Sequence, residues 1–296
     1  MHIAYRQFSL LKLPLTIECI LNCTDYLFVG TKQGHLLQYA IQGGSPAKNS
    51  SSSSASHNGA TSDQQQQPQP SEVVAPRVQL LRTNKNFSKK PITQLAAIPE
   101  HSVLVVLCNN QLSAHDMDMT VINFPTIHVV EKAKGASLFA VDCVRQVTLT
   151  GETAVLCRLV VAVKKRLQFY YWKNRQFLEL HQEISLPDFP KSLEWCKDSI
   201  CVGFKGEYSL IKMSQSQEIQ ELFPNNASSS RPQVTKLSDE RFALQKGAQT
   251  TFIDLQGNLK LYTVNWGEVP AGLAHDPPYL LGVQSGSVEV RTEDPR

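Results

Sequence analysis

One pattern recurs six times along the 296 residues: a run of β-branched and aromatic residues, a short polar or glycine turn, and a second alternating run. Each copy is typical of a β-hairpin. The last four turns follow one another after 41, 41 and 39 residues, measured between Lys165, Gly206, Gly247 and Gly286. A period of about 40 residues with room for four strands is the spacing of propeller blades. The six hairpins are expected at residues 26–40, 102–116, 159–172, 199–212, 241–254 and 279–291.

The sequence therefore predicts an all-β fold, a single β-propeller domain over residues 1–296. Inner-strand candidates precede the hairpins, as at 92–98, and outer-strand candidates follow them, as at 177–184. Helices are scarce, because no long stretch sustains apolar residues at helical spacing. The alternative, a two-sheet sandwich, fits this many strands at blade spacing poorly.

The N-terminal residues 3–10 are strand-like and have no hairpin before them, whereas only TEDPR follows the last hairpin's second run. We expect this N-terminal strand to close the ring by pairing as the outer strand of the last blade. Closure would remove two exposed sheet edges, which otherwise invite aggregation.

Residues 43–72 differ in composition from the rest of the chain. They contain nine Ser and five Gln and no hydrophobic residue larger than Ala. Such a stretch cannot bury enough surface to offset the entropy of ordering it, so we expect a disordered low-complexity loop inserted within the propeller. The alternative is a regulatory loop that is phosphorylated on its serines.

Charged residues are nearly balanced, with 29 Lys and Arg against 26 Asp and Glu and a net charge of +3. This excess is too small to argue for nucleic acid as a partner. A bilayer-spanning helix needs about 20 largely apolar residues, and the longest uninterrupted apolar run here, Val103 to Cys108, has six. The first residues are interrupted by Arg6, Lys12 and Pro14 and show no signal peptide.

The seven cysteines are an odd number and lack the C-x-x-C spacing of zinc sites. Most lie in apolar runs, which is typical of reduced, buried thiols in a cytosolic protein. We therefore expect no disulfide, no metal site and a cytoplasmic location. The cysteines are at positions 19, 23, 108, 143, 157, 196 and 201.

No arrangement of residues marks a catalytic centre. The segment GVQSG at 282–286 is similar to a nucleophile elbow, but its serine is one position late and lies in a predicted hairpin turn. His115 and Asp116 are adjacent on a predicted strand, so they point to opposite faces. The sequence has no phosphate-binding loop and no histidine pair at metal-binding spacing. We expect no enzyme activity and no cofactor.

Basic clusters interleaved with aromatic residues are better candidates for function. Lys89 and Lys90 end one cluster, and Lys164, Lys165 and Arg166 form another at a predicted hairpin turn. Such clusters can receive an acidic patch of a partner protein or anionic lipid head groups. The alternative is a solvated turn whose lysines discourage edge pairing while nearby aromatic residues pack between blades. Because the whole chain is nearly neutral, acidic surface elsewhere must balance these charges.

Several motifs occur in order along the chain, among them VGTKQGHLL (29–37), NKNFSKK (84–90), VAVKKRLQFYYWK (161–173), PKSLEWCKDSICVGFK (190–205) and VEVRTEDPR (288–296). Together they resemble the N-terminal citron homology (CNH) domain of the Vam6/TRAP-one-like family, the Rab-associated subunits of the HOPS tethering complex. The resemblance covers the whole chain except the insertion. The WD dipeptides of many propellers are absent, which favours the CNH type over the WD40 type.

The resemblance implies a seven-bladed propeller, which is one blade more than the six hairpins counted. In family members a long α-solenoid follows the propeller, and that solenoid is missing here. It implies a non-enzymatic protein-interaction module that acts in vesicle tethering and membrane fusion between endosomes or autophagosomes and lysosomes or vacuoles. The implied partners are other HOPS subunits, a late-endosomal Rab GTPase and, peripherally, anionic membrane. The implied location is the cytoplasmic side of late endosomes and lysosomes. The family carries over no catalytic or nucleotide-binding residue.

Three alternatives stay open. A CORVET-type, TGF-β-receptor-associated paralogue resembles the chain less well, chiefly over KQGHLL and WCKDSICVGFK. A regulatory CNH module of a kinase or exchange factor belongs to the same binding class. A propeller hydrolase would need carboxylates or histidines around a central channel.

Overall fold

The computed structural model describes residues 8–42, 75–121, 123–147, 151–213, 218–224, 231–237 and 240–293. Within these ranges the chain forms 23 β-strands and two short 3-10 helices, η1 (Pro99–His101) and η2 (Glu131–Ala133). The strands make six antiparallel sheets, in each of which consecutive strands are neighbours. The predicted all-β class is confirmed.

The first three sheets have four strands each. Sheet 1 contains β1 (Ile17–Cys23), β2 (Tyr26–Thr31), β3 (Leu36–Gln42) and β4 (Arg77–Asn84). Sheet 2 contains β5 (Ile92–Ile98), β6 (Val103–Cys108), β7 (Gln111–Asp116) and β8 (Thr126–Val129). Sheet 3 contains β9 (Ala136–Val147), β10 (Thr153–Val163), β11 (Arg166–Lys173) and β12 (Gln176–Ser185).

Of the remaining three sheets, two have four strands and the last has three. Sheet 4 contains β13 (Ser192–Cys196), β14 (Ser199–Gly203), β15 (Glu207–Lys212) and β16 (Ile219–Pro224). Sheet 5 contains β17 (Val234–Lys236), β18 (Phe242–Lys246), β19 (Gln249–Ile253) and β20 (Leu259–Asn265). Sheet 6 contains β21 (Gly272–Asp276), β22 (Tyr279–Val283) and β23 (Val288–Thr292).

The six predicted hairpins are the second and third strands of the six sheets. They are the pairs β2–β3, β6–β7, β10–β11, β14–β15, β18–β19 and β22–β23. The predicted inner and outer strands complete each unit, and only sheet 6 lacks an outer strand among the described residues. The repeat found in the sequence is therefore one sheet.

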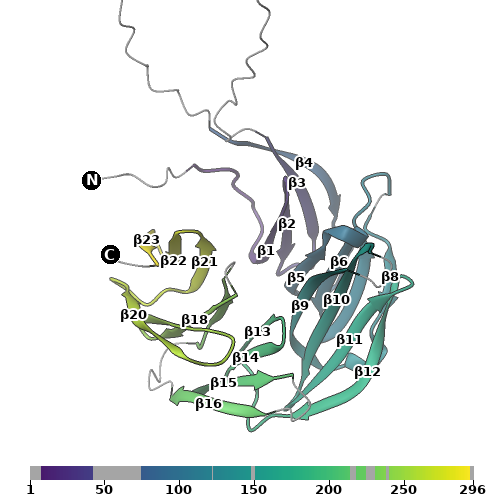
Figure 1. The fold of residues 1–296 in the computed structure, drawn as a ribbon. Helices are drawn as coiled ribbons and strands as arrows, with labels where there is room; N and C mark the ends of the chain where they lie inside the picture. Colours follow the sequence, from purple (N-terminus) through teal and green to yellow (C-terminus); the bar gives the residue numbers. More distant parts are fainter. Residues whose placement is uncertain are drawn as a thin grey trace, which may run out of the picture.

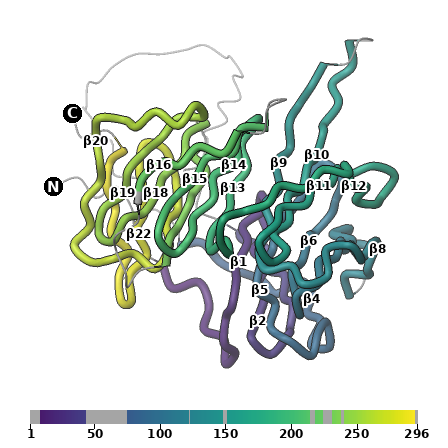
Figure 2. The backbone as a smooth tube through the Cα atoms, turned by 90° about the horizontal axis from the view of Figure 1, so that it is seen from below, coloured from purple at the N-terminus to yellow at the C-terminus, as the bar shows by residue number. Residues whose placement is uncertain are grey.

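The sheets stand around a common axis, with the first strand of each sheet innermost (Figure 1). These inner strands lie against one another in chain order, β1 beside β5 and onward to β21 beside β17. This is the arrangement of a propeller with six described blades. In the perpendicular view, β9 and β10 extend beyond the neighbouring sheets (Figure 2), since they are 12 and 11 residues long.

Alternation of side chains along the middle strands explains the stacking. On β6, Leu104 and Val106 pack toward sheet 1, in a cluster with Phe28. Val103, Val105 and Leu107 of the same strand pack toward sheet 3. Successive residues of a strand point to opposite faces, so a strand that is apolar throughout needs a sheet on either side. Similar clusters join sheets 3 and 4, 4 and 5, and 5 and 6.

Two expectations about the ring have different outcomes. The six hairpins match six sheets, and the seven blades implied by the family resemblance are not reached by the described residues. Of residues 3–10, which were expected to close the ring, residues 3–7 lie outside the described ranges and residues 8–10 are not in a strand. The expected loop insertion at 43–72 also lies outside them. Closure and loop disorder therefore stay predictions.

Residues 8–16 lead into β1 without regular secondary structure. Their leucines Leu11, Leu13 and Leu15 pack on the face of sheet 1 that points away from sheet 2, against Val29 and Leu37. In this part of the ring a single extended segment covers the apolar surface that a neighbouring sheet covers elsewhere.

Burial between sheets predicts a large effect of truncating Leu159, which is fully buried between sheets 2 and 3. We expect Leu159→Ala to lower the free energy of unfolding by about 2–5 kcal/mol, since it leaves a cavity in a close-packed core. The matched control is Leu261→Ala, because Leu261 is fully exposed on β20; it should change stability by less than about 0.5 kcal/mol. Urea unfolding of both variants measures this, and equal effects would contradict the inter-sheet packing.

Candidate functional site

The meander topology separates the connections of the ring into two sets. In a four-stranded antiparallel sheet, the segment entering the first strand and the turn between the second and third strands lie at the same end. The segment carrying Lys89 and Lys90 enters β5, and the turn at Lys164 and Lys165 joins β10 to β11. The two predicted clusters therefore lie on one face of the ring, although they belong to different sheets.

Charges divide strongly between the two ends of the sheets. Among the described connections between strands on the face of Lys89 and Lys164, eleven basic residues stand against the three acidic residues Glu131, Asp188 and Glu268. We call this the lysine face. The basic residues are Lys32, Lys85, Lys89, Lys90, Lys132, Lys134, Lys164, Lys165, Lys191, Lys205 and Arg231.

The opposite face has the reverse balance. Its described connections carry three basic residues, Arg175, Lys197 and Arg241, against eight acidic ones. The acidic residues are Asp25, Glu100, Asp118, Glu152, Asp198, Glu218, Glu240 and Asp254. The sequence predicted that acidic surface must balance the basic clusters, and the fold places it at the other end of the strands.

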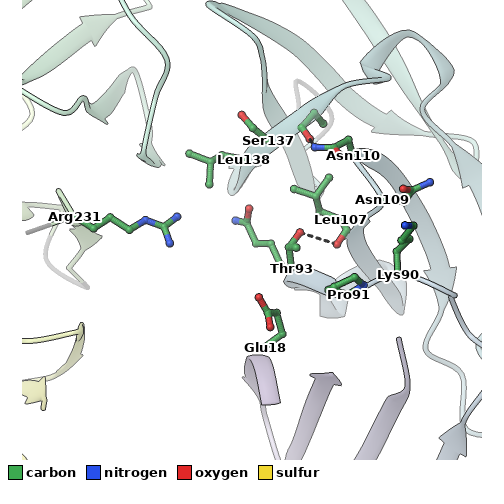
Figure 3. Close-up of a pocket in the computed structure, with 12 residues that line it drawn as sticks. Glu18, Lys90, Pro91, Thr93, Leu107, Asn109, Asn110, Ser137, Leu138 and Arg231 are labelled. Atoms are coloured by element: carbon green, nitrogen blue, oxygen red, sulfur yellow. Dashed lines mark hydrogen bonds between the residues drawn. The ribbon is translucent and has the colours of Figure 1, made fainter. Parts of the chain in front are cut away.

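A cavity of about 570 Å³ opens at the centre of the lysine face (Figure 3). Its lining comes from several sheets and includes Glu18, Lys90 and Asn110 on one side and Arg231 across from them. A second cavity of about 350 Å³ shares Arg231 and is lined by the first residues of β13, β17 and β21. The two cavities share Gln94, Leu138 and Arg231 and are bordered in part by polar and charged groups.

The segment that carries Lys89 and Lys90 is fixed against sheet 1. The Ser88 N–H donates to the Gly34 carbonyl (3.0 Å), and the Lys90 N–H donates to Ser88 Oγ (2.9 Å). Gly34 has φ +80°, and a Cβ there would lie 2.1 Å from the Ser88 carbonyl oxygen. Only glycine allows this close approach. Lys89 and Lys90 are exposed and form no ion pair with a described residue.

The second cluster is partly neutralised by its own neighbours. Lys165 Nζ lies 3.2 Å from Asp188 and donates to the Pro187 carbonyl, and Arg166 lies 3.0 Å from Glu183. Lys164 is in the left-handed region and has no ion pair among the described residues. Of the five predicted residues, Lys89, Lys90 and Lys164 are therefore the ones that present unpaired charge.

The pKa values of the acidic partners, Asp188 and Glu183, are consistent with this pairing. The pKa of Asp188 lies below its ordinary value because the Phe189 backbone N–H donates to it, with Lys165 adding to the effect. The pKa of Glu183 is lowered first by its hydrogen bond from Gln168 and then by Arg166. These carboxylates stay ionised and hold the positive charges of Lys165 and Arg166.

One aromatic residue on the lysine face was not predicted as a site residue. Phe189 is 49% exposed and lies 5.3 Å from Lys165 Nζ, measured to the ring centroid. It is in the connection between β12 and β13, two residues before Lys191. In the sequence Phe189 stands between Asp188 and Pro190, with Lys191 next, and this proline-rich context is the signal that could have marked it. Aromatic residues are enriched at protein contact surfaces.

The residues considered for catalysis have structural partners. His115 is buried, with Nδ1 2.9 Å from the Phe124 carbonyl and Nε2 2.8 Å from Ser113 Oγ. Burial lowers its pKa. Asp116 points elsewhere and pairs with Arg175 of sheet 3 (2.8 Å). The GVQSG segment includes the β22–β23 turn, as predicted.

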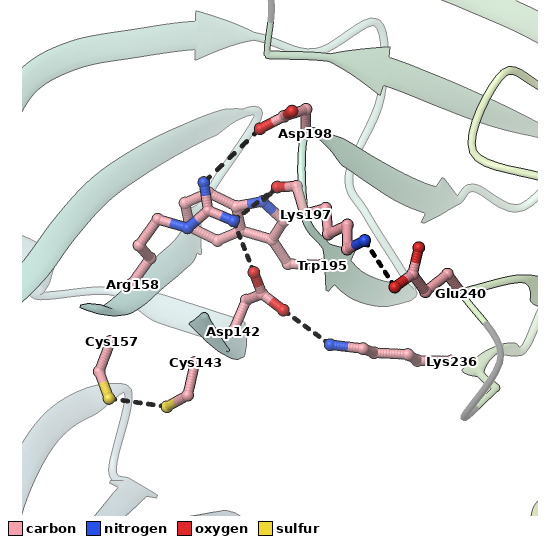
Figure 4. A network of polar contacts seen from close by, with 9 residues as sticks. All are labelled: Asp142, Cys143, Cys157, Arg158, Trp195, Lys197, Asp198, Lys236 and Glu240. Atoms are coloured by element: carbon pink, nitrogen blue, oxygen red, sulfur yellow. Dashed lines mark hydrogen bonds and ion pairs between the residues drawn. The ribbon is translucent and has the colours of Figure 1, made fainter. Parts of the chain in front are cut away.

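A buried carboxylate joins three sheets on the side of the opposite face (Figure 4). Asp142 of β9, with a side chain only 3% exposed, pairs with Arg158 of β10 (2.6 Å) and Lys236 of β17 (2.7 Å). Arg158 also donates to the Lys197 carbonyl and lies over the Trp195 ring at 4.6 Å. Sequence reasoning missed this network, because its members are far apart in the chain and no motif marks them.

The seven cysteines are free thiols, of which four are buried. Cys143 and Cys157 lie opposite each other on β9 and β10. Together with Glu100 they form a group whose possible metal-ligand atoms all lie within 4.8 Å of one another. The sequence predicted no metal site, because neither cysteine belongs to a C-x-x-C pair.

A family model described as the CNH domain matches residues 77–294, which include all of sheets 2 to 6. The chain belongs to the CNH domain family. The resemblance seen in the sequence is thus confirmed. No helix within the described ranges has the length and apolar character needed to cross a bilayer.

Relatives of this CNH domain are found among vacuolar sorting proteins. The chain is 40% identical to the Vam6/Vps39-like protein of Homo sapiens, over all of this chain and 31% of that protein. It is 27% identical to the vacuolar protein sorting-associated protein 39 homolog of Drosophila melanogaster, over 99% of this chain and 32% of that protein. The chain therefore spans about a third of the length of these relatives.

A solved structure described as the AfRom2 CNH domain has the same fold. It superposes with a TM-score of 0.55 at 15% identity and covers 96% of this chain and 83% of that one. At this identity the likeness shows the fold alone.

The Asp142 network predicts a second stability effect. We expect Asp142→Ala to cost on the order of 2–3 kcal/mol, because it leaves Arg158 and Lys236 without their carboxylate in a largely buried place. Both cations keep some contact with water, which holds the cost below that of a fully buried pair. The matched control is Asp198→Ala, since Asp198 reaches the same Arg158 at 3.9 Å from an 89% exposed position and should cost less than about 0.5 kcal/mol. Urea unfolding measures both, and a harmless Asp142→Ala would contradict the role of the network.

Proposed function

We propose that this CNH domain is a non-enzymatic docking module of a HOPS-type vacuolar sorting subunit. The proposal is supported by family membership and by full coverage of the chain in relatives named Vam6/Vps39-like and vacuolar protein sorting-associated protein 39. A ring of stacked sheets supplies rigid, wide faces for recognition. The histidine and carboxylate considered for catalysis are engaged in structural contacts.

The unequal charge of the two faces is the observation that indicates which surface binds a partner. A molecule with net charge +3 that gathers its lysines at one end orients itself in the field of an acidic partner. We therefore assign the partner-facing role to the lysine face, with Lys89, Lys90 and Lys164 as unpaired charges. Phe189 adds an apolar contact near them.

The finer assignment concerns the partners. We propose that the lysine face turns toward a late-endosomal Rab GTPase and the anionic membrane that carries it, while other HOPS subunits hold the module in place. The module would then act in tethering before fusion of endosomes or autophagosomes with lysosomes or vacuoles, from the cytoplasmic side of those membranes. Attraction of this kind weakens as salt rises, since the Debye length is about 8 Å at physiological ionic strength.

The test reverses the unpaired charges in a triple variant, Lys89→Glu, Lys90→Glu and Lys164→Glu. We expect at least about tenfold weaker binding to the GTP-loaded late-endosomal Rab, or to vesicles containing anionic lipid, at physiological salt, and a shallower dependence on salt. Rab pull-down and vesicle co-sedimentation, each with the domain inside the full-length protein, separate the two partners.

The charge-matched control is Lys173→Glu, Lys197→Glu and Lys260→Glu, which makes the same change of net charge away from the lysine face. These lysines are exposed at the surface or in exposed ion pairs, so the control should fold and bind like the wild type. Equal binding by both triple variants would remove the lysine face from the proposal. Failure of the wild type to bind either partner would overturn the docking role itself.

A further inference from the structure

The inter-sheet contact between sheets 2 and 3 contains a pair of thiols. Cys143 on β9 and Cys157 on β10 are register partners, and their Sγ atoms lie 2.8 Å apart (Figure 4). Asp142 and Arg158, one residue away on the same strands, point to sheet 4. By alternation the two thiols point to sheet 2, and both belong to the cluster that sheets 2 and 3 share.

A carboxylate from sheet 2 completes the group. Glu100 is part of η1, in the connection from β5 to β6, and its carboxylate lies within 4.8 Å of both sulfur atoms. Cys157 is fully buried, Cys143 is partly exposed and Glu100 is exposed. The three side chains thus form a small site that is closed on the inside and open to solvent on the outside.

We propose that Cys143, Cys157 and Glu100 bind a thiophilic divalent cation, with Zn²⁺ as the physiological ion. Two thiolates and one carboxylate are a donor set that zinc accepts, and a water molecule would fill the fourth position of the tetrahedron. This site is independent of the proposed docking role, since it lies toward the opposite face.

The distances suit this ion after a small adjustment. With Zn–S bonds of about 2.3 Å, two sulfur atoms on one tetrahedral zinc lie about 3.8 Å apart. The observed Sγ–Sγ distance of 2.8 Å must therefore grow by about 1 Å. Rotation of the partly exposed Cys143 side chain can supply this change without moving either strand.

The nearby carboxylate also favours a cation. Glu100 is exposed, and its negative charge lies within 4.8 Å of both sulfur atoms. This charge attracts a divalent ion. On binding, each thiol gives its proton to solvent and each sulfur forms a bond to the metal, so one dipositive ion replaces two protons.

Binding has a structural consequence that is specific to this position. The ligands come from both sheets 2 and 3, so the ion would link two neighbouring blades at the rim of their common core. Zinc motifs that can be recognised in a sequence contain closely spaced pairs of ligands. Here the pairing of β9 with β10 and the approach of η1 bring together positions 100, 143 and 157.

The test titrates the purified 296-residue chain with Co²⁺ and Cd²⁺ in a reducing buffer, followed by displacement with Zn²⁺. We expect one ion per chain and a thiolate-to-metal charge-transfer band that Zn²⁺ removes. Cys143→Ser should abolish the band and weaken Zn²⁺ binding at least tenfold. Glu100→Gln should keep the band and weaken binding severalfold, and because Glu100 is exposed this variant should fold normally.

The matched control is Cys108→Ser. The Cys108 thiol donates a hydrogen bond to Ser88 Oγ on the side of sheet 2 that faces sheet 1, so this substitution should leave the band unchanged. Circular dichroism of Cys143→Ser verifies that the variant is folded. Absence of the band in the wild type, its persistence in Cys143→Ser, or its loss in Cys108→Ser would overturn the proposal. Formation of a Cys143–Cys157 disulfide without any metal uptake in reducing buffer would also overturn it.

Discussion

Burial of apolar side chains between neighbouring sheets is the interaction on which this structure depends. The middle strands are apolar at consecutive positions, as in β6, where neighbouring residues pack toward sheets 1 and 3. A sheet with two apolar faces is stable only between two other layers. Repeating the same unit about every 40 residues supplies such layers by stacking the sheets around an axis. Where no sheet covers sheet 1, the leucines of residues 8–16 do so.

The separation of charge follows from that packing. Because the faces of the sheets are buried, charged residues remain mainly on the connections and the outer strands, and the meander sends alternate connections to opposite ends. Basic residues predominate on one set of connections and carboxylates on the other. A nearly neutral chain thereby acquires one basic and one acidic face, which suits the docking role proposed for it.

Contacts between sheets also create places where distant residues meet. Asp142 and Cys143 are adjacent on β9, yet one serves a charged network toward sheet 4 and the other a thiol pair toward sheet 2. Their cross-strand partners, Arg158 and Cys157, are adjacent as well. Two adjacent cross-strand pairs of β9 and β10 thus take part in two different inter-sheet contacts. Both contacts are buried, since the Asp142 side chain is 3% exposed and Cys157 is fully buried.

The sequence by itself determined the class, the repeat and the six hairpins, because strand alternation and tight turns are local properties that each unit carries within about 40 residues. It also singled out Lys89, Lys90 and Lys164, since runs of charge are visible without a structure. Only the tertiary structure decided that these lysines share one face and that Asp188 and Glu183 neutralise Lys165 and Arg166. It alone brought Glu100 to the thiols of Cys143 and Cys157. Those relations depend on strand register and on the stacking of separate sheets, which distances along the chain do not encode.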